Sequence, residues 1–290
     1  MRRRSGRAAH GRCAKPQSLM GMRNRAAGFV LCAVALLAVG CGRKQETPPV
    51  RIIATDRVYE APAGVPAGLR HIIFENRGSE IHEAMFVKLT TGMTAESYLA
   101  ALESGASFPQ GATDYSGPGL TSPGESVELW LNLDPGEYIL ICWYFGHART
   151  TRIHHLRVEE VGALDNRPPR EDVVLKLFDY RFELEGRPRK GIQTLRIETP
   201  GPGMHEVDFF RLLEGRTLED LRRWRKERGQ TPIPAVALSG ILDSHDIRRV
   251  VWLRREFTPG RYVLLCQMPV PNTDLKHDDM GMVREIEITE

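Results

Sequence analysis

The sequence predicts an all-β protein made of two tandem β-sandwich domains, each with one short helix. Three observations lead to this prediction. Short apolar or alternating runs recur between Pro and Gly residues, as strands do between turns. One segment in each half has helical spacing behind a threonine. The same order of histidine, threonine, Pro-Gly turn and cysteine also occurs twice, which indicates a duplicated domain.

The N-terminal segment predicts export. Residues 1–40 combine a basic start, the apolar run GFVLCAVALLAVG and small residues before Cys41, which is the order found in secretory signals. The segment resembles a bacterial lipoprotein signal, which implies that Cys41 becomes the lipid-carrying first residue of the mature protein. Met20 and Met22 are alternative starts, because each leaves basic residues before the apolar run. An uncleaved anchor helix is the other interpretation. Both place the remainder outside the cytoplasm, in the cell envelope, facing the periplasm or the exterior.

The mature part divides into four predicted segments, which are a tether (41–50), domain 1 (51–160), a linker (161–171) and domain 2 (172–290). The linker VGALDNRPPRE is rich in proline and charge, as connecting segments are. Removal of the signal removes eight basic residues and no acidic one, which leaves 32 basic against 37 acidic residues. A net charge of about −5 gives no basic surface, so we expect no nucleic-acid partner.

Strands are expected where an apolar or alternating run is bounded by turn residues. In domain 1 these runs are LRHIIFEN, HEAMFVKL, SVELWLNL, YILICWYF and IHHLRVEE. In domain 2 they are VVLKLFDY, TLRIET, EVDFFRLL, RVVWLRREF, YVLLCQM and VREIEI. The helices are expected to begin after Thr94 and Thr217, which are good N-cap residues. Leu218, Leu221 and Trp224 recur on one face of the second helix, which predicts packing against the core.

The repeat also fixes how the cysteines correspond. His82 and His205 each precede a threonine by twelve residues, and Cys142 and Cys266 each follow the proline of a Pro-Gly turn by seven. The histidine-to-cysteine separation differs between the copies by only one residue. The two cysteines are therefore equivalent positions in two domains, and we do not expect a disulfide between them.

The stretch CQMPVPNTDLKHDDMGM, residues 266–282, places metal-binding side chains in one loop between two strands of domain 2. Cys266 ends the apolar strand, and His277 and Met282 follow before the last strand, while His205 comes from a turn upstream. Two imidazoles, one thiolate and a weak thioether contact are the ligands of a blue-copper electron-transfer site. Soft sulfur suits Cu(I) and imidazole suits Cu(II), so this set serves both redox states.

These residues resemble the cupredoxin family, in which the last core strands flank a loop of Cys, His and Gly-Met, with a further histidine from upstream. The resemblance covers nearly the whole mature chain as two domains and implies Greek-key β-sandwiches of cupredoxin type. It implies one copper ion in domain 2, held by the four residues just named. Met280 and Met268 are rival axial ligands. Met282 is preferred, because it follows a glycine and directly precedes the strand.

Domain 1 matches the pattern only in part. His82, Cys142 and His147 correspond to the domain 2 ligands, but the alignment places Arg152 at the position of the methionine. A guanidinium beside a metal cation is unfavourable. We therefore expect a degenerate, structural domain in which a second copper ion is unlikely.

A glutamate follows the upstream histidine in both copies, Glu83 in the first and Glu206 in the second. Each could orient the adjacent histidine as a hydrogen-bond acceptor. The favoured interpretation is that both are simply the exposed, alternate residues of a strand.

The neighbours of the two cysteines bear on catalysis. In multidomain copper enzymes, as the resemblance implies, a histidine beside the cysteine ligand leads to a catalytic copper. Here the neighbours are Ile141 and Trp143, and Leu265 and Gln267, and the sequence contains no His-x-His pair. We therefore expect a membrane-tethered one-electron carrier with a redox partner protein, and not an enzyme. The alternatives are a copper storage or delivery protein, and a metal-free β-sandwich lipoprotein that serves as an interaction module.

Overall fold

The computed structural model describes residues 47–106, 109–149, 153–161, 166–227, 230–244 and 250–290. The predicted signal, the alternative starts and the lipid-carrying Cys41 lie outside these residues, as does Arg152. Within the described part of the chain, neither helix has the length and apolar character needed to cross a membrane.

Strands are the main regular structure in both halves, and the all-β class with one short α-helix per half is confirmed. The elements of the first half are β1 (Val50–Ala54), β2 (Tyr59–Glu60), β3 (Gly64–Pro66), β4 (Gly68–Asn76), β5 (Met85–Leu89), α1 (Ala95–Glu103), β6 (Ala112–Asp114), β7 (Ser126–Leu133), β8 (Gly136–Ile141), the 3-10 segment η1 (Tyr144–Arg149) and β9 (His154–Glu159). Those of the second half are β10 (Val173–Phe178), β11 (Arg181–Glu185), β12 (Gly191–Glu198), β13 (Val207–Leu212), α2 (Leu218–Lys226), β14 (Ala235–Ile241), β15 (Val250–Phe257), β16 (Gly260–Leu265) and β17 (Val283–Ile288).

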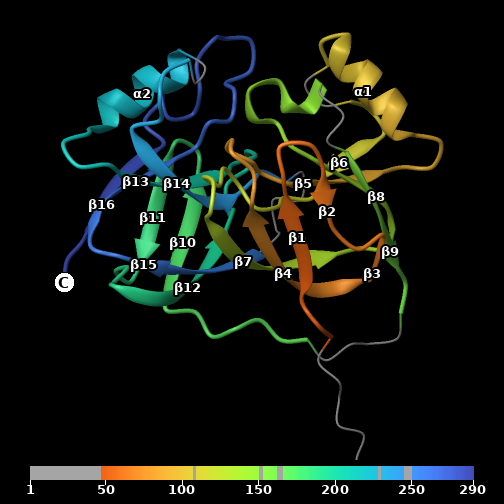
Figure 1. The fold of residues 1–290 in the computed structure, drawn as a ribbon, viewed down its shortest axis with the longest axis horizontal. Coiled ribbons are helices and arrows are strands. Elements are labelled where there is room, and N and C mark those ends of the chain that lie inside the picture. The colour runs from red at the N-terminus through yellow and green to blue at the C-terminus, as the bar shows by residue number, and fades with distance from the viewer. Residues whose placement is uncertain (1–46, 107–108, 150–152, 162–165, 228–229, 245–249) are drawn as a thin grey trace, which may run out of the picture. The chain divides into compact units, whose positions relative to one another are not determined.

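The strands form three sheets, and one of them runs through both halves. A five-stranded sheet, β3-β9-β8-β5-β6, belongs to the first half, and a four-stranded sheet, β14-β13-β16-β17, belongs to the second. The third has eight strands in the order β11-β10-β12-β15-β7-β4-β1-β2. It is continuous because β15 pairs with β7, with Leu253 opposite Leu129 (Figure 1). The boundaries expected for the two domains stay a prediction, and the shared sheet was not foreseen.

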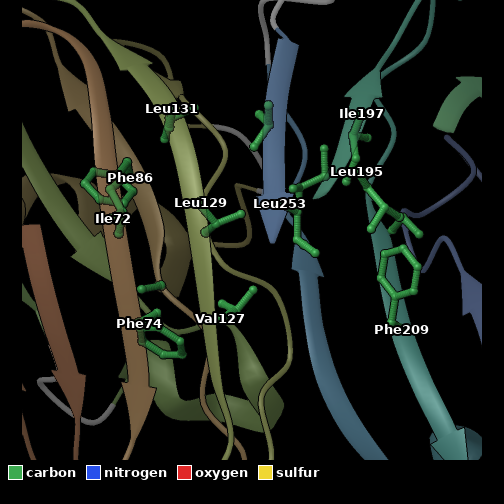
Figure 2. Close-up of a cluster of buried hydrophobic side chains, with 14 of the residues drawn as sticks. Ile72, Phe74, Phe86, Val127, Leu129, Leu131, Leu195, Ile197, Phe209 and Leu253 are labelled. Atoms are coloured by element: carbon green, nitrogen blue, oxygen red, sulfur yellow. The ribbon is translucent and has the colours of Figure 1, made fainter. Parts of the chain in front are cut away.

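The core follows the shared sheet. One buried apolar cluster contains side chains from both halves, and Figure 2 shows Leu129 of β7 and Leu253 of β15 on neighbouring strands within it. The same cluster includes Cys142, Cys266 and Met282. Burial of each leucine contributes about 1.5–3 kcal/mol, so the core holds the two halves together and surrounds both cysteines.

The two helices begin where the sequence predicts. Thr94 and Thr217 each accept a hydrogen bond from the backbone N–H three residues on, and each closes a capping box. Leu221 and Trp224 of α2 are buried, as the spacing predicts. Each capping box satisfies two backbone donors at a helix start, so the start of α2 is well defined. The helix lies beside the loop that contains His277.

Candidate metal centres

Three of the residues predicted for domain 2 meet at one point. Cys266 follows β16, His205 precedes β13, and His277 lies in the loop before β17. The Cys266 Sγ lies 3.4 Å from the Nδ1 of His277, and this Nδ1 lies 3.1 Å from the Nδ1 of His205. All three side chains are buried, and their donor atoms lie within 4.8 Å of one another.

Each of the two histidine rings has a further contact outside the cluster. The Nε2 of His205 lies 2.9 Å from the Oδ1 of Asp179. The ring of His277 packs edge-on against Tyr180, with 5.2 Å between the ring centres. A carboxylate on the outer nitrogen fixes the tautomer and orientation of a metal-binding histidine. The Nδ1 of His205 therefore faces the Nδ1 of His277, which in turn lies beside the Cys266 Sγ.

Burial, followed by the nearby His205, lowers the pKa of His277 to about 4. A neutral imidazole is the form that binds a metal. Burial also raises the pKa of the Cys266 thiol well above its usual range, and the carboxylate of Glu206 adds to this effect. A cation at the centre would favour the thiolate, because a metal ion deprotonates a thiol that coordinates it.

The three candidate axial methionines differ in exposure. Met282 is fully buried in the cluster that contains Cys266, and its carbonyl accepts the backbone N–H of Cys266 at 3.2 Å. Met268 is buried as well, whereas the side chain of Met280 is 46% exposed. Exposure of Met280 places it at the surface, so the packing favours Met282 or Met268 over Met280.

Domain 1 contains a matching cluster. The Cys142 Sγ lies 3.4 Å from the Nδ1 of His147 and 4.0 Å from the Nδ1 of His82. Both outer nitrogens reach carboxylates, with His82 Nε2 at 3.1 Å from Asp56 and His147 Nε2 at 3.0 Å from Glu80. The structure thus brings the three residues together in the arrangement that it gives to their counterparts in domain 2.

The strand register supports the alignment of the two copies. Tyr138 pairs with Leu156 in the first half, and Tyr262 pairs with Ile286 at the equivalent place in the second. Cys142 and Cys266 are both free thiols. Each cysteine lies in its own histidine cluster.

The interpretation of the two glutamates was wrong. Glu83 is buried, and its Oε1 accepts the backbone N–H of Trp143 at 2.7 Å. Glu206 is only partly exposed, and its Oε1 accepts the N–H of Gln267 at 2.8 Å. Burial, with the charge of Asp208 next, raises the pKa of Glu83 to about 8. Each glutamate therefore holds the residue that follows the cysteine, because an internal acceptor is needed where water is excluded.

Two acids that contact the upstream histidines were missed. Asp56 and Asp179 each precede their histidine by 26 residues. A single acid in a turn has no local pattern to mark it. The repeat could have revealed these acids, because an aspartate stands at the same number of residues before the histidine in both copies.

The donor set fits a single copper ion. Metal bonds of about 2.0–2.3 Å to nitrogen and sulfur would place the donors of a trigonal site roughly 3.5–3.7 Å apart. The separations given above, 3.1–4.0 Å, bracket this range. Two imidazoles and one thiolate are the trigonal ligands of blue-copper centres. The two clusters and the β-sheets that hold them agree with the resemblance to cupredoxins noted in the sequence.

Solved structures similar to this chain include an auracyanin, a multicopper oxidase and a copper-containing nitrite reductase. Reduced auracyanin from Roseiflexus castenholzii is 18% identical over 40% of this chain and 99% of its own, with a TM-score of 0.31. A multicopper oxidase is 13% identical over 86% of this chain and 93% of its own, with a TM-score of 0.26. The copper-containing nitrite reductase of Thermus scotoductus SA-01 is 14% identical over 83% of this chain and 61% of its own, with a TM-score of 0.23. No protein-family profile and no curated protein matches the chain.

The prediction that the chain is not an enzyme was wrong. The oxidase and the nitrite reductase, which match most of this chain, are both enzymes. The prediction depended on the missing His-x-His pair and on the residues beside each cysteine.

Proposed function

We propose that the protein binds copper through His205, Cys266 and His277, with Met282 as the weak axial ligand, and transfers single electrons at this centre. The observation that supports the proposal is the convergence of two Nδ1 atoms on one buried thiol. The donor types suit both copper redox states. When bound, the copper ion would supply the one-electron chemistry, and the protein would supply the binding and the orientation.

The surroundings of Cys266 favour a site that changes little when its charge changes. The backbone N–H of Cys266 donates to the carbonyl of Met282, and its own carbonyl accepts the N–H of Asp278 at 3.0 Å. The next residue, Gln267, is held by Glu206. A ligand whose backbone and neighbours are all hydrogen-bonded keeps its position. Such a site needs little rearrangement when an electron arrives or leaves.

His277 lies close to groups that a partner could contact. Its ring packs on Tyr180, which is partly exposed, and Leu275 and Met280 on the same loop are exposed apolar residues. Lys276 is next to His277 in the sequence and adds a charge to this surface. We propose that a redox partner protein docks here, with charge guiding its approach.

The location of the protein is part of the proposal. The basic start, the apolar run and Cys41 support an exported lipoprotein that is anchored to a membrane and faces the periplasm or the cell exterior. A Cys41→Ala variant expressed in a bacterium tests this part. Release of the variant from the membrane fraction, with the unaltered protein retained there, is the expected result. Equal distribution of the two proteins would contradict lipid anchoring.

A copper titration followed by visible absorption tests the centre itself. We expect an intense thiolate-to-copper band that saturates near one equivalent, is lost with Cys266→Ser and remains with Cys142→Ser. A second equivalent that is lost only with Cys142→Ser would overturn the prediction that domain 1 lacks copper. Rapid loss of copper to a competing chelator would favour a storage or delivery protein. Absence of any retained copper would refute the proposal and favour a metal-free interaction module.

A further inference from the structure

The loop that presents His277 is unusually long for its position. Ten residues separate Cys266 from His277, whereas four separate Cys142 from His147 at the equivalent place. A longer loop has more conformations to lose when it is ordered. The position of His277 therefore requires contacts that the shorter loop does not need.

Backbone hydrogen bonds hold the two ends of the loop together. The N–H of His277 donates to the carbonyl of Met268 at 2.9 Å, and the N–H of Val270 donates to that of Leu275 at 2.9 Å. These bonds close the loop as a hairpin. They do not by themselves fix the hairpin against the rest of the domain.

An arginine from α2 provides that attachment. Arg225 donates from Nη1 to the Oδ1 of Asp278, and from Nη2 to the Oδ1 of Asp279 at 2.9 Å. Asp278 directly follows His277, and its side chain is fully buried. The Arg225 side chain is only 10% exposed, so water screens the pair poorly. A planar guanidinium that binds two carboxylates fixes direction as well as distance.

The helix that carries Arg225 is itself rigidly placed. Its start is fixed by the capping box at Thr217, and Leu221 and Trp224 anchor it in the core. In α1 the residue at the equivalent distance from the cap is Leu102, and the last turn of α1 contains no basic residue. The arginine thus occurs in the copy with the long loop and is missing from the copy with the short one.

We infer that Arg225 is a positioning residue for the copper centre. It holds the backbone that follows His277 and thereby directs the Nδ1 of His277 toward Cys266. The inference rests on the proposed function only for its effect on copper. Its effect on the orientation of His277 can be measured in the metal-free protein.

Arg225→Gln and Arg225→Lys test the inference, with Arg223→Gln as the control. Arg223 lies on the same helical turn, but its side chain is 61% exposed and contacts Asp220, on its own helix, at 3.5 Å. We expect Arg225→Gln to weaken copper binding by about 10–100-fold, as the loss of an outer contact of a metal site does. We expect it also to shift the thiolate-to-copper band and the reduction potential. Arg225→Lys should restore part of each effect, and Arg223→Gln should change none.

Imidazole NMR signals of the metal-free proteins separate failure of this inference from failure of the proposed function. We expect Arg225→Gln to move the signals of His277 and to leave those of His147 in place, whether or not copper binds. Unchanged His277 signals, or a copper spectrum and potential equal to those of the unaltered protein, would overturn the role of Arg225. If Arg225→Gln does not fold, Asp279→Asn removes the charge from one of the two contacts with Arg225 and is measured instead. The expected shifts have the same direction and are smaller.

Discussion

The carboxylate of Glu83 accepts the backbone N–H of Trp143 at 2.7 Å. Glu83 follows the ligand candidate His82, and Trp143 follows Cys142, so this hydrogen bond joins the two segments that carry these residues. Glu206 does the same for Gln267 in the second half. Each contact joins the two strands that carry a cluster. The buried glutamates therefore belong to the framework of the two centres.

The raised pKa of Glu83 predicts a pH-dependent stability. Its folded pKa of about 8 lies above the ordinary value of 4.5 because of burial, with Asp208 adding to the shift. Between these values the folded state binds more protons than the unfolded state, so stability falls as pH rises. We expect the melting temperature of the metal-free protein to decrease from pH 5 to pH 8. Glu83→Gln should flatten this dependence, and equal slopes for the two proteins would contradict the assignment.

His277 should remain neutral in mildly acidic solution. Burial, with His205 next, lowers its folded pKa to about 4, below the ordinary value of 6.5. Between pH 6.5 and about 4 the unfolded state binds the additional proton, so this group lowers stability as pH falls. An NMR titration of the metal-free protein should place the midpoint of His277 near 4. A midpoint near 6.5 would show that the ring is exposed to water.

The axial assignment predicts different outcomes for two methionines. Replacement of Met282 with leucine removes the proposed thioether donor and should raise the reduction potential, because a more apolar site with one ligand fewer disfavours the more highly charged Cu(II). Met280→Leu is the matched control, since that side chain is largely exposed. Voltammetry of the copper-loaded proteins measures both. A larger shift for Met280→Leu would reverse the assignment.

The shared sheet predicts cooperative unfolding of the two halves. Leu253 is fully buried where β15 pairs with β7, and Leu253→Ala should cost about 2–5 kcal/mol in the free energy of unfolding. Ile192→Ala, at a position 66% exposed on β12, should cost much less. Denaturation followed by fluorescence should give a single transition. Two separate transitions, with Leu253→Ala affecting only one, would contradict cooperativity between the halves.

The sequence allowed the members of the two His-Cys-His clusters to be grouped because they are marked twice. The repeated histidine and cysteine could be aligned, and the register of Tyr138 with Leu156 and of Tyr262 with Ile286 agrees with that alignment. Strand runs and helix starts were also predictable, since alternation and capping are local signals.

Contacts between distant segments were not predictable in the same way. Arg225 is one of several basic residues on α2, and nothing local indicates that it reaches Asp278. The pairing of β7 with β15 was missed because an edge strand and an internal strand can have the same alternating pattern. The short strands β2, β3 and β6 have too few residues to show a period.

The pairing of β7 with β15 also covers strands that one half alone would leave exposed. Each of these strands would be the open edge of its own sheet if the halves were separated, and an open edge is a template for pairing with another chain. In the intact protein each edge is covered by the other copy. The duplication therefore acts as an internal dimerisation, in which a fixed partner on the same chain takes the place of a second molecule.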